Sequence, residues 1–138
     1  MTDLSIIIVS WNVRDLLRDC LASIEAGAQA GLYTLAGPGG RAGQGVPLTV
    51  EPIVVDNLSS DGTPGMLREA FPWVRLVEPG ENTGFTRGNN LGMQASAGRW
   101  LFLLNPDTVV LDDALPRMVS YIDAQPAVGA LGPQLLND

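Results

Sequence analysis

The feature that most constrains the fold of this chain is the alternation of short apolar runs with segments of helical periodicity. Residues 4–10 form a continuous apolar run rich in β-branched side chains, the pattern of a strand covered on both faces. Asn12 is the predicted N-cap of an amphipathic helix over 13–25, because apolar residues recur there at helical spacing. Similar signals predict strands at 49–56, 74–78, 99–104 and 128–131, and helices at 63–70, 85–97 and 112–124. This order predicts an α/β fold, with a mostly parallel, Rossmann-like sheet and helices on both faces.

Length and composition predict a single domain over residues 1–138, because 138 residues with 46% hydrophobic side chains are enough for one core. Within it, residues 26–48 are rich in Gly, Ala and Pro, and we predict a flexible surface loop there. Gly37, Gly39 and Ala42 satisfy a loose GxGxxA pattern. A dinucleotide site requires a strand before that pattern and a helix after it. Neither is predicted, so we interpret the match as fortuitous.

The chain contains no His and no Lys, and its eight basic residues are all Arg. Nucleophilic catalysis with an imidazole base, a histidine zinc site, a Walker A phosphate loop and a lysine Schiff base are therefore excluded for this chain alone. The lone Cys20 cannot form an internal disulfide, and its apolar helical neighbours predict a small core residue rather than a reactive thiol.

The formal net charge of −7 argues against a nucleic-acid partner, whose phosphates require a basic surface. If phosphate binds, helix N-termini and a divalent cation are the available means. No apolar run approaches the roughly 20 residues of a membrane span, and the N-terminus lacks the basic region of a secretory signal. We therefore predict a cytoplasmic location, either free or, for a full-length protein, peripheral to the inner face of the membrane.

Short polar side chains follow three of the predicted strands, and parallel sheets bind ligands at the carboxyl ends of their strands. Each cluster alone is equally typical of turns and helix caps. Asp56 is placed to accept a hydrogen bond from a base imide N–H or a ribose hydroxyl. Trp11 either presents its face to a nucleobase or packs into the core. The three clusters are Ser10-Trp11-Asn12, Asp56-Asn57 with the residues to Thr63, and Asn105-Pro106-Asp107-Thr108.

Two further segments suit a diphosphate and its metal. Asp107 offers an oxygen ligand on a tight turn, which suits Mg²⁺ or Mn²⁺ that keeps waters and takes other ligands from a diphosphate. The alternative is an ordinary turn residue. Residues 82–92 predict a helix start crowded with glycines and amides, where the backbone can approach an anion closely. Arg87 there either contacts phosphate or faces solvent.

These motifs resemble glycosyltransferase family 2 of the GT-A fold, in its rhamnosyltransferase-like branch. The resemblance implies a nucleobase platform at Trp11, a base-recognising carboxylate at Asp56, and a DxD-type metal element in which Asp107 is a ligand and Asn105 replaces the first acid. It extends the expected donor-nucleotide contacts to further positions. The matching motifs are residues 6–12, 53–63, 82–92, 104–108 and 129–138, and the further positions are Ser10, Asn12, Asn57, Asn82, Gly84, Arg87, Asn89 and Asn90.

The resemblance implies an inverting transfer of a sugar from a UDP-, dTDP- or GDP-sugar to a saccharide or lipid-linked acceptor, in cell-surface polysaccharide or glycolipid synthesis, with Mg²⁺ or Mn²⁺ as cofactor. Family members carry their general base in a second half, so we expect the base beyond Asp138 and no transfer by this chain alone. No residue here is assigned as catalytic, and the oligomeric state is left open.

Three other classes remain to be weighed. A nucleotidyltransferase-like domain shares the α/β layout, but the segment after the first strand lacks its Gly-rich loop and basic residue. A phosphorylated receiver domain requires a Lys that is absent. A non-catalytic nucleotide-binding module remains open beside the transferase.

Overall fold

The computed structural model describes residues 1–37 and 48–137, and the predicted alternation of strands and helices is present. Within these residues lie five strands and four helices. In chain order they are β1 (Leu4–Ser10), α1 (Arg14–Gln29), β2 (Thr34–Leu35), β3 (Thr49–Asp56), α2 (Thr63–Ala70), β4 (Arg75–Val77), α3 (Gly84–Ala95), β5 (Trp100–Leu103) and α4 (Ala114–Asp123).

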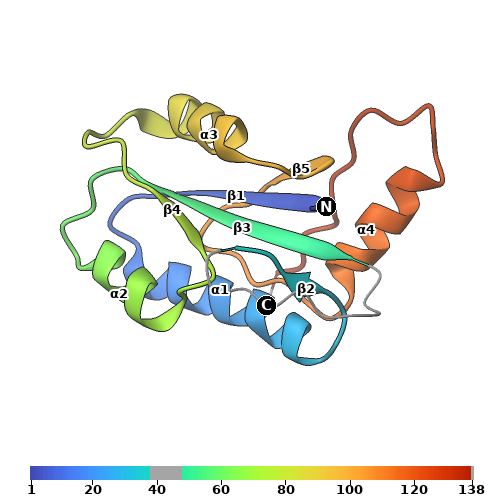
Figure 1. The fold of residues 1–138 in the computed structure, drawn as a ribbon, viewed down its shortest axis with the longest axis horizontal. Coiled ribbons are helices and arrows are strands. Elements are labelled where there is room, and N and C mark those ends of the chain that lie inside the picture. Colours follow the sequence, from blue (N-terminus) through green and yellow to red (C-terminus); the bar gives the residue numbers. More distant parts are fainter. Residues whose placement is uncertain (38–47, 138) are drawn as a thin grey trace.

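All strand pairs of the sheet are parallel, and the main order is β2-β3-β1-β5. β1 occupies one edge of β3 along its length, so β2 and β4 share the other edge, with β2 at the start of β3 and β4 nearer its end. Figure 1 shows α3 on one face of this sheet and α1 and α2 on the other. The predicted fold class is therefore confirmed.

The main core lies between the sheet and α1. Alternate residues of β1 and β3, including Ile6, Ile8 and Val54, are fully buried on this face. Cys20 belongs to the same cluster and is fully buried, as predicted for a small core residue. Burial raises the pKa of its thiol to about 11, an effect that the nearby Asp107 charge reinforces and a hydrogen bond from Thr108 opposes. The thiol is therefore protonated at neutral pH.

Two glycines let α3 lie very close to the opposite face of the sheet. A Cβ added to Gly88 would stand 2.8 Å from Val9 Cγ1, and one added to Gly92 would stand 2.4 Å from Ile7 Cγ2. Both distances are too short for carbon atoms in contact. These glycines thus serve helix–sheet packing, whereas the sequence suggested that the glycines of this segment admit a ligand.

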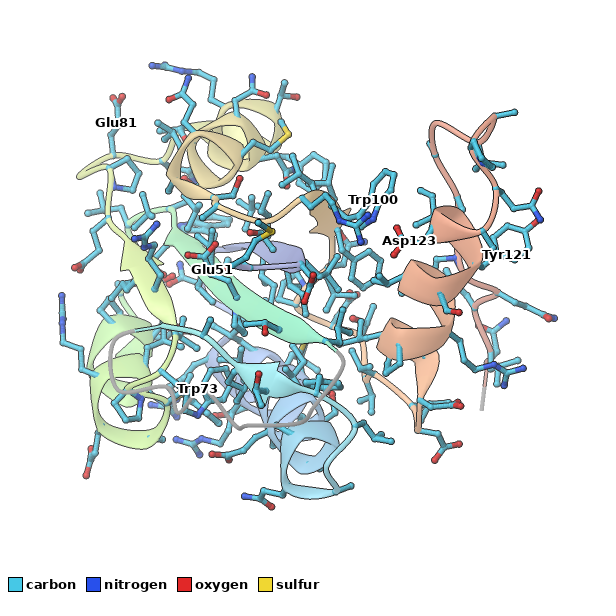
Figure 2. All side chains as sticks on the ribbon, turned by 45° about the vertical axis from the view of Figure 1, so that its right-hand side comes forward. Glu51, Trp73, Glu81, Trp100, Tyr121 and Asp123 are labelled. Atoms are coloured by element: carbon cyan, nitrogen blue, oxygen red, sulfur yellow. The ribbon has the colours of Figure 1, made fainter. Side chains whose placement is uncertain are left out.

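A buried carboxylate fixes the chain between α3 and β5. Glu51, in the middle of β3, accepts hydrogen bonds from the Ser5 hydroxyl at 2.8 Å and the Ala97 amide at 3.0 Å. Arg75 of β4 lies 3.5 Å from its other oxygen. Figure 2 shows Glu51 among these elements, and its network joins β1, β3 and β4 to the end of α3. The sequence signal for this network was a charged residue, Glu51, within an apolar run.

Three expectations from the sequence are wrong. The segment predicted as a loop from residue 26 instead contains the end of α1, which continues to Gln29, and then β2. Buried Gly27 leaves room for the Tyr33 ring, whose hydroxyl donates to Ile24 O at 2.7 Å. Gly39 and Ala42 lie outside the described residues. Asn12 is not the N-cap of α1, because that position is Val13, whose own side chain makes no cap hydrogen bond.

The third concerns the end of the chain. Residues 128–131 form no strand, and residues 129–131 instead line a cavity of about 140 Å³ with β5 and α4. β5 is only half-buried, because α3 covers β1 and β3 and leaves Leu101 and Leu103 exposed by 45% and 49%. No helix in the described part of the chain is long and apolar enough to cross a membrane.

Candidate functional site at the carboxyl edge of the sheet

Ser10 and Asp56 end two neighbouring strands and are partners in the β1–β3 register. Both residues are buried, with exposures of 0% and 3%. Asp56 Oδ2 accepts a hydrogen bond from the Ser59 amide at 3.0 Å, whereas Asp56 Oδ1 and Ser10 Oγ have no partner. Among the described residues these are the two buried side-chain oxygens left unpaired. An unpaired buried polar atom costs free energy. Two such atoms on neighbouring strand ends therefore mark a place for a ligand or water.

Trp11 follows Ser10 directly, and its side chain is 56% exposed. Of the two alternatives left open by the sequence, core packing is therefore excluded. An exposed indole in the residue that follows β1 offers a flat apolar face that a nucleobase or another ring can cover.

Asn57 attaches the start of α3 to the end of β3. Its Oδ1 accepts from the Thr83 hydroxyl at 2.8 Å and the Thr83 amide at 3.2 Å, and its Nδ2 donates to Gly84 O at 3.1 Å. The side chain is buried and its polar atoms are engaged within the protein. The N-terminus of α3 is thereby fixed beside the carboxyl edge of the sheet.

The first turn of α3 carries no acidic residue, and it begins at Gly84, whose φ is +76°. Asn82 Oδ1 accepts from the Gly84 amide at 2.9 Å. Arg87 is exposed, and its guanidinium lies 4.0 Å from Glu81. The positive end of the helix dipole and this guanidinium together favour an anion at this corner.

The side chains of Asn89 and Asn90, both in α3, differ in their exposure to solvent. Asn89 is buried, with 6% exposure, and its Nδ2 donates to Phe85 O at 3.1 Å within the helix. Asn90 is exposed. The expected contacts of Asn89 and Asn90 with a nucleotide therefore stay predictions, and Asn90 has the more accessible side chain.

The turn after β5 leaves the same edge of the sheet. The Leu104 amide donates to Ile7 O at 2.9 Å, so residue 105 follows beside the end of β1. Asn105 and Asp107 are both exposed, and the Thr108 hydroxyl donates to Asn105 O at 2.8 Å. β1 separates β5 from β3 and neighbouring strands are ~4.8 Å apart, so the backbones of β5 and β3 are roughly 10 Å apart. The turn after β5 and Asp56 therefore follow strands that end at the same edge of the sheet.

The donor set at this turn suits a divalent cation that is only partly coordinated by protein. The described residues contain no group of three His, Cys, Asp or Glu side chains able to hold a metal. One exposed carboxylate with a neighbouring amide fits Mg²⁺ or Mn²⁺ whose remaining ligands are water and diphosphate oxygens. Asp107 and Asn105 are the residues that can hold it.

Hydrogen bonds that the sequence did not predict tie the loops after β1 and β3 together. The Asn12 amide donates to Ser59 Oγ at 3.0 Å, and the Ser60 amide donates to Asn12 Oδ1 at 2.8 Å. Asp61 Oδ2 accepts from the Arg14 amide at 2.9 Å, and Arg14 Nη1 donates to Asp61 O at 3.0 Å. We call these five residues the loop clasp. The Asp-Gly-Thr sequence before a helix was the available signal for it.

The arrangement resembles solved glycosyltransferases in fold. S. aureus TarS in complex with UDP-GlcNAc superimposes with a TM-score of 0.70 at 16% identity, over 96% of this chain and 37% of that one. The mannosyltransferase PcManGT from Pyrobaculum calidifontis, in complex with GDP-Man and Mn²⁺, gives a TM-score of 0.68 at 24% identity, over 91% of this chain and 33% of that one. The chain thus has the fold of the GT-A glycosyltransferases.

The sequence comparisons identify the family within that fold. The family model described as glycosyl transferase family 2 matches residues 5–136, and the chain belongs to this family. Succinoglycan biosynthesis protein ExoO of Rhizobium meliloti is 40% identical over 78 residues, which are 56% of this chain and 22% of that protein. The N-acetylglucosaminyl-diphospho-decaprenol L-rhamnosyltransferase of Mycobacterium tuberculosis is 33% identical over 95 residues, which are 61% of this chain and 31% of that protein.

Proposed function

We propose that this chain is the donor-binding part of an inverting glycosyltransferase, which uses a nucleotide-diphospho-sugar to glycosylate a hydroxyl acceptor. The observation that carries the proposal is the unpaired pair Ser10 Oγ and Asp56 Oδ1, buried at the carboxyl edge beside exposed Trp11. Membership of glycosyl transferase family 2 supports the reaction class. Neighbours of the same fold are described in complex with UDP-GlcNAc and with GDP-Man.

The proposed base site uses three residues at the ends of β1 and β3. Asp56 Oδ1 accepts the ring N–H of uracil, thymine or guanine, and Ser10 Oγ donates to an adjacent carbonyl. The Trp11 indole covers the base. Both oxygens are shielded from solvent, so entry of the base requires movement of the side chains that cover them. Asn12 and Asn57, whose side chains are engaged within the protein, support this site through the loops they hold.

The diphosphate is proposed to lie between the N-terminus of α3 and the turn after β5. The positive N-terminal end of α3 and the guanidinium of Arg87 attract its negative charge, with Asn82 just before the helix and Asn90 in its second turn. A divalent cation, when bound by Asp107 and Asn105, neutralises charge on the departing diphosphate. The description of a neighbour with Mn²⁺ supports this cofactor class.

The acceptor side is proposed to lie in the part of the relatives that this chain does not span. The chain spans about a fifth to a third of the length of the curated relatives that it matches. We propose a carboxylate general base beyond Asp138, a saccharide or lipid-linked acceptor, and a hexose or rhamnose as the transferred sugar. The succinoglycan and rhamnosyltransferase relatives support a role in cell-surface polysaccharide or glycolipid synthesis. We propose the cytoplasmic face of the membrane as the place of this synthesis.

Calorimetric titration with UDP, dTDP and GDP, with and without Mn²⁺, tests the proposal. We expect one of these nucleotides to bind, Mn²⁺ to strengthen binding, and Asp107→Asn to remove the strengthening. Asp112→Asn is the matched control, because it removes the same charge from an exposed residue of the same segment, and its φ of 43° suits Asn. Absence of binding by all three nucleotides contradicts the proposal.

A non-catalytic nucleotide-binding module gives the same titration, since it shares the binding step. A transfer assay on a longer form of the protein, with labelled nucleotide-sugar and membrane lipid extract, separates the two. Labelled glycolipid supports the transferase, and tight nucleotide binding without transfer or donor hydrolysis supports the module.

A further inference from the structure

The loop clasp joins two segments that are 47 residues apart in sequence and carry the proposed base site. The segment after β1 contains Trp11, and the segment after β3 begins at Asp56. Three hydrogen bonds join Asn12 to Ser59 and Ser60, and two more join Asp61 to Arg14. The Asn57 amide adds a sixth at the base, donating to Ser10 O at 2.8 Å.

Asp61 accepts hydrogen bonds from the first residues of both helices that follow these loops. One oxygen accepts from the Arg14 amide at the start of α1, and the other accepts from the Thr63 amide at 3.1 Å and the Thr63 hydroxyl at 2.6 Å at the start of α2. Both helices lack a side-chain cap of their own at the N-cap position. Partial burial by itself raises the pKa of Asp61, but these hydrogen bonds outweigh it and leave that pKa below its usual value. The carboxylate is therefore ionised at neutral pH, which strengthens each bond it accepts.

The clasp fixes the backbone on both sides of Trp11 without touching its exposed ring. Ser10 O on one side and the Asn12 amide on the other are both bonded to the 57–60 segment. Asn12 has a φ of 52° and Leu58 a φ of 63°, conformations that cost free energy for non-glycine residues and persist where surrounding bonds enforce them. The two unpaired oxygens, Ser10 Oγ and Asp56 Oδ1, lie at the base of the same two segments.

We propose that Asp61, together with Asn12, is a positioning residue for nucleotide binding that acts through Trp11. The clasp holds the Trp11 indole in the place where it covers a base bonded to Asp56. Neither Asp61 nor Asn12 contacts the nucleotide. This inference rests on the proposed function, and it assigns to Asp61 a role that the base and metal sites do not require.

The test compares Asp61→Asn with Asp15→Asn in the native protein and in a Trp11→Ala background. Asn has one carboxamide oxygen, so it cannot accept from both Arg14 and Thr63. Asp15 is the matched control: it lies in the first turn of α1, its side chain is 77% exposed, and its contact with Arg14 Nε at 3.2 Å is a surface ion pair between neighbouring residues that does not join the two loops. The probe is whichever of UDP, dTDP and GDP the native protein binds most tightly with Mg²⁺, measured by calorimetry.

We expect Asp61→Asn to weaken binding about tenfold, the scale of one hydrogen bond to a charged group, and Asp15→Asn to leave it unchanged. In the Trp11→Ala background, Asp61→Asn has no further effect on affinity, because the residue through which it acts is missing. A purely structural role lowers affinity equally in both backgrounds. That result, or equal losses from Asp61→Asn and Asp15→Asn, overturns the inference and leaves the proposed function standing.

Asn12→Gly makes the same comparison with less risk to folding. Glycine adopts the φ of 52° freely, so the variant deletes the bond to the Ser60 amide and keeps the backbone path. We expect weaker binding that again disappears in the Trp11→Ala background, and full affinity in the variant contradicts the inference. If the native protein binds none of the three nucleotides, the proposed function fails and this inference fails with it.

Discussion

Asp56→Asn exchanges one buried atom at the base of the proposed site and keeps the shape of the side chain. In the native protein Oδ2 accepts a hydrogen bond from the Ser59 amide, and Oδ1 has no partner. The carboxamide oxygen of the variant takes over the bond from Ser59, so its NH₂ group replaces the free oxygen. A position that accepts a hydrogen bond thereby becomes one that donates.

The size of the effect follows from that reversal. Uracil, thymine and guanine each present a ring N–H, which the native Asp56 Oδ1 accepts and the variant's NH₂ opposes. A hydrogen bond to a charged group contributes about 1.5–3 kcal/mol, and 1.4 kcal/mol is a factor of ten, so affinity falls by roughly 10- to 100-fold. Cytosine presents a ring nitrogen acceptor at the same place. CDP is therefore expected to bind the native protein weakly and the variant at least as well.

The assay is a calorimetric titration of UDP, dTDP, GDP and CDP at one Mg²⁺ concentration. Glu69→Gln is the control, because Glu69 is an exposed acid on α2 and its replacement removes the same charge. The reasoning is refuted if Asp56→Asn keeps native affinity for the preferred nucleotide while the native protein binds CDP equally well. Asp56 then does not recognise the base.

Three further predictions concern stability and reactivity. Gly92→Ala places a Cβ 2.4 Å from Ile7 Cγ2 and is expected to lower the free energy of unfolding in urea by about 1–3 kcal/mol. Gly65→Ala on α2 meets no atom within 4 Å and is expected to stabilise the protein. Equal effects of the two substitutions contradict the close packing of α3 on the sheet. The buried Cys20 thiol, with its pKa raised to about 11, is expected to resist a thiol reagent at pH 8 until urea unfolds the protein, and rapid labelling of folded protein contradicts its burial. Because the pKa of Asp61 is lowered on folding, its contribution to stability is full above its unfolded value and is lost as pH falls through the folded value. The melting temperature of Asp61→Asn is thus expected below that of the native protein at pH 7, with a gap that narrows as the pH falls, and a gap that widens in acid contradicts this sign.

The fold was predictable where local pattern and burial agree. The continuous apolar runs gave β1 and β3 with the bounds that the structure shows. Pro64 and the small residues before it gave the start of α2. These elements need no distant partner to be recognised, since an apolar strand and an amphipathic helix each carry their own periodicity. Residues 128–131 show the limit of this reasoning, because an apolar run becomes a strand only where a neighbour is free to pair with it.

The site was predictable as a set of strand ends but not as a set of contacts. That Ser10 and Asp56 stand side by side follows from the β1–β3 register, which the sequence does not contain. Asn12 and Asn57 were expected to contact a ligand, and the structure shows both side chains bonded to protein groups. The contact of Asp61 with Arg14 could not be predicted, because the two residues lie 47 positions apart in sequence.

The three indole N–H groups of the protein test the central claim, that a nucleotide binds at the carboxyl edge of the sheet. Trp11 stands at that edge. Trp73 donates to Glu25 at 3.2 Å and Trp100 donates to Asp123 at 2.9 Å, both away from it, and Figure 2 shows Trp100 and Asp123 facing one another between β5 and α4. These two groups serve as internal controls in the same spectrum.

The measurement is a ¹⁵N–¹H correlation spectrum recorded during titration with UDP, dTDP or GDP and Mg²⁺. The account predicts that the Trp11 indole signal moves with saturation while those of Trp73 and Trp100 stay in place. Movement of the Trp100 signal without that of Trp11, or no movement of any of the three signals with any of the nucleotides, contradicts it.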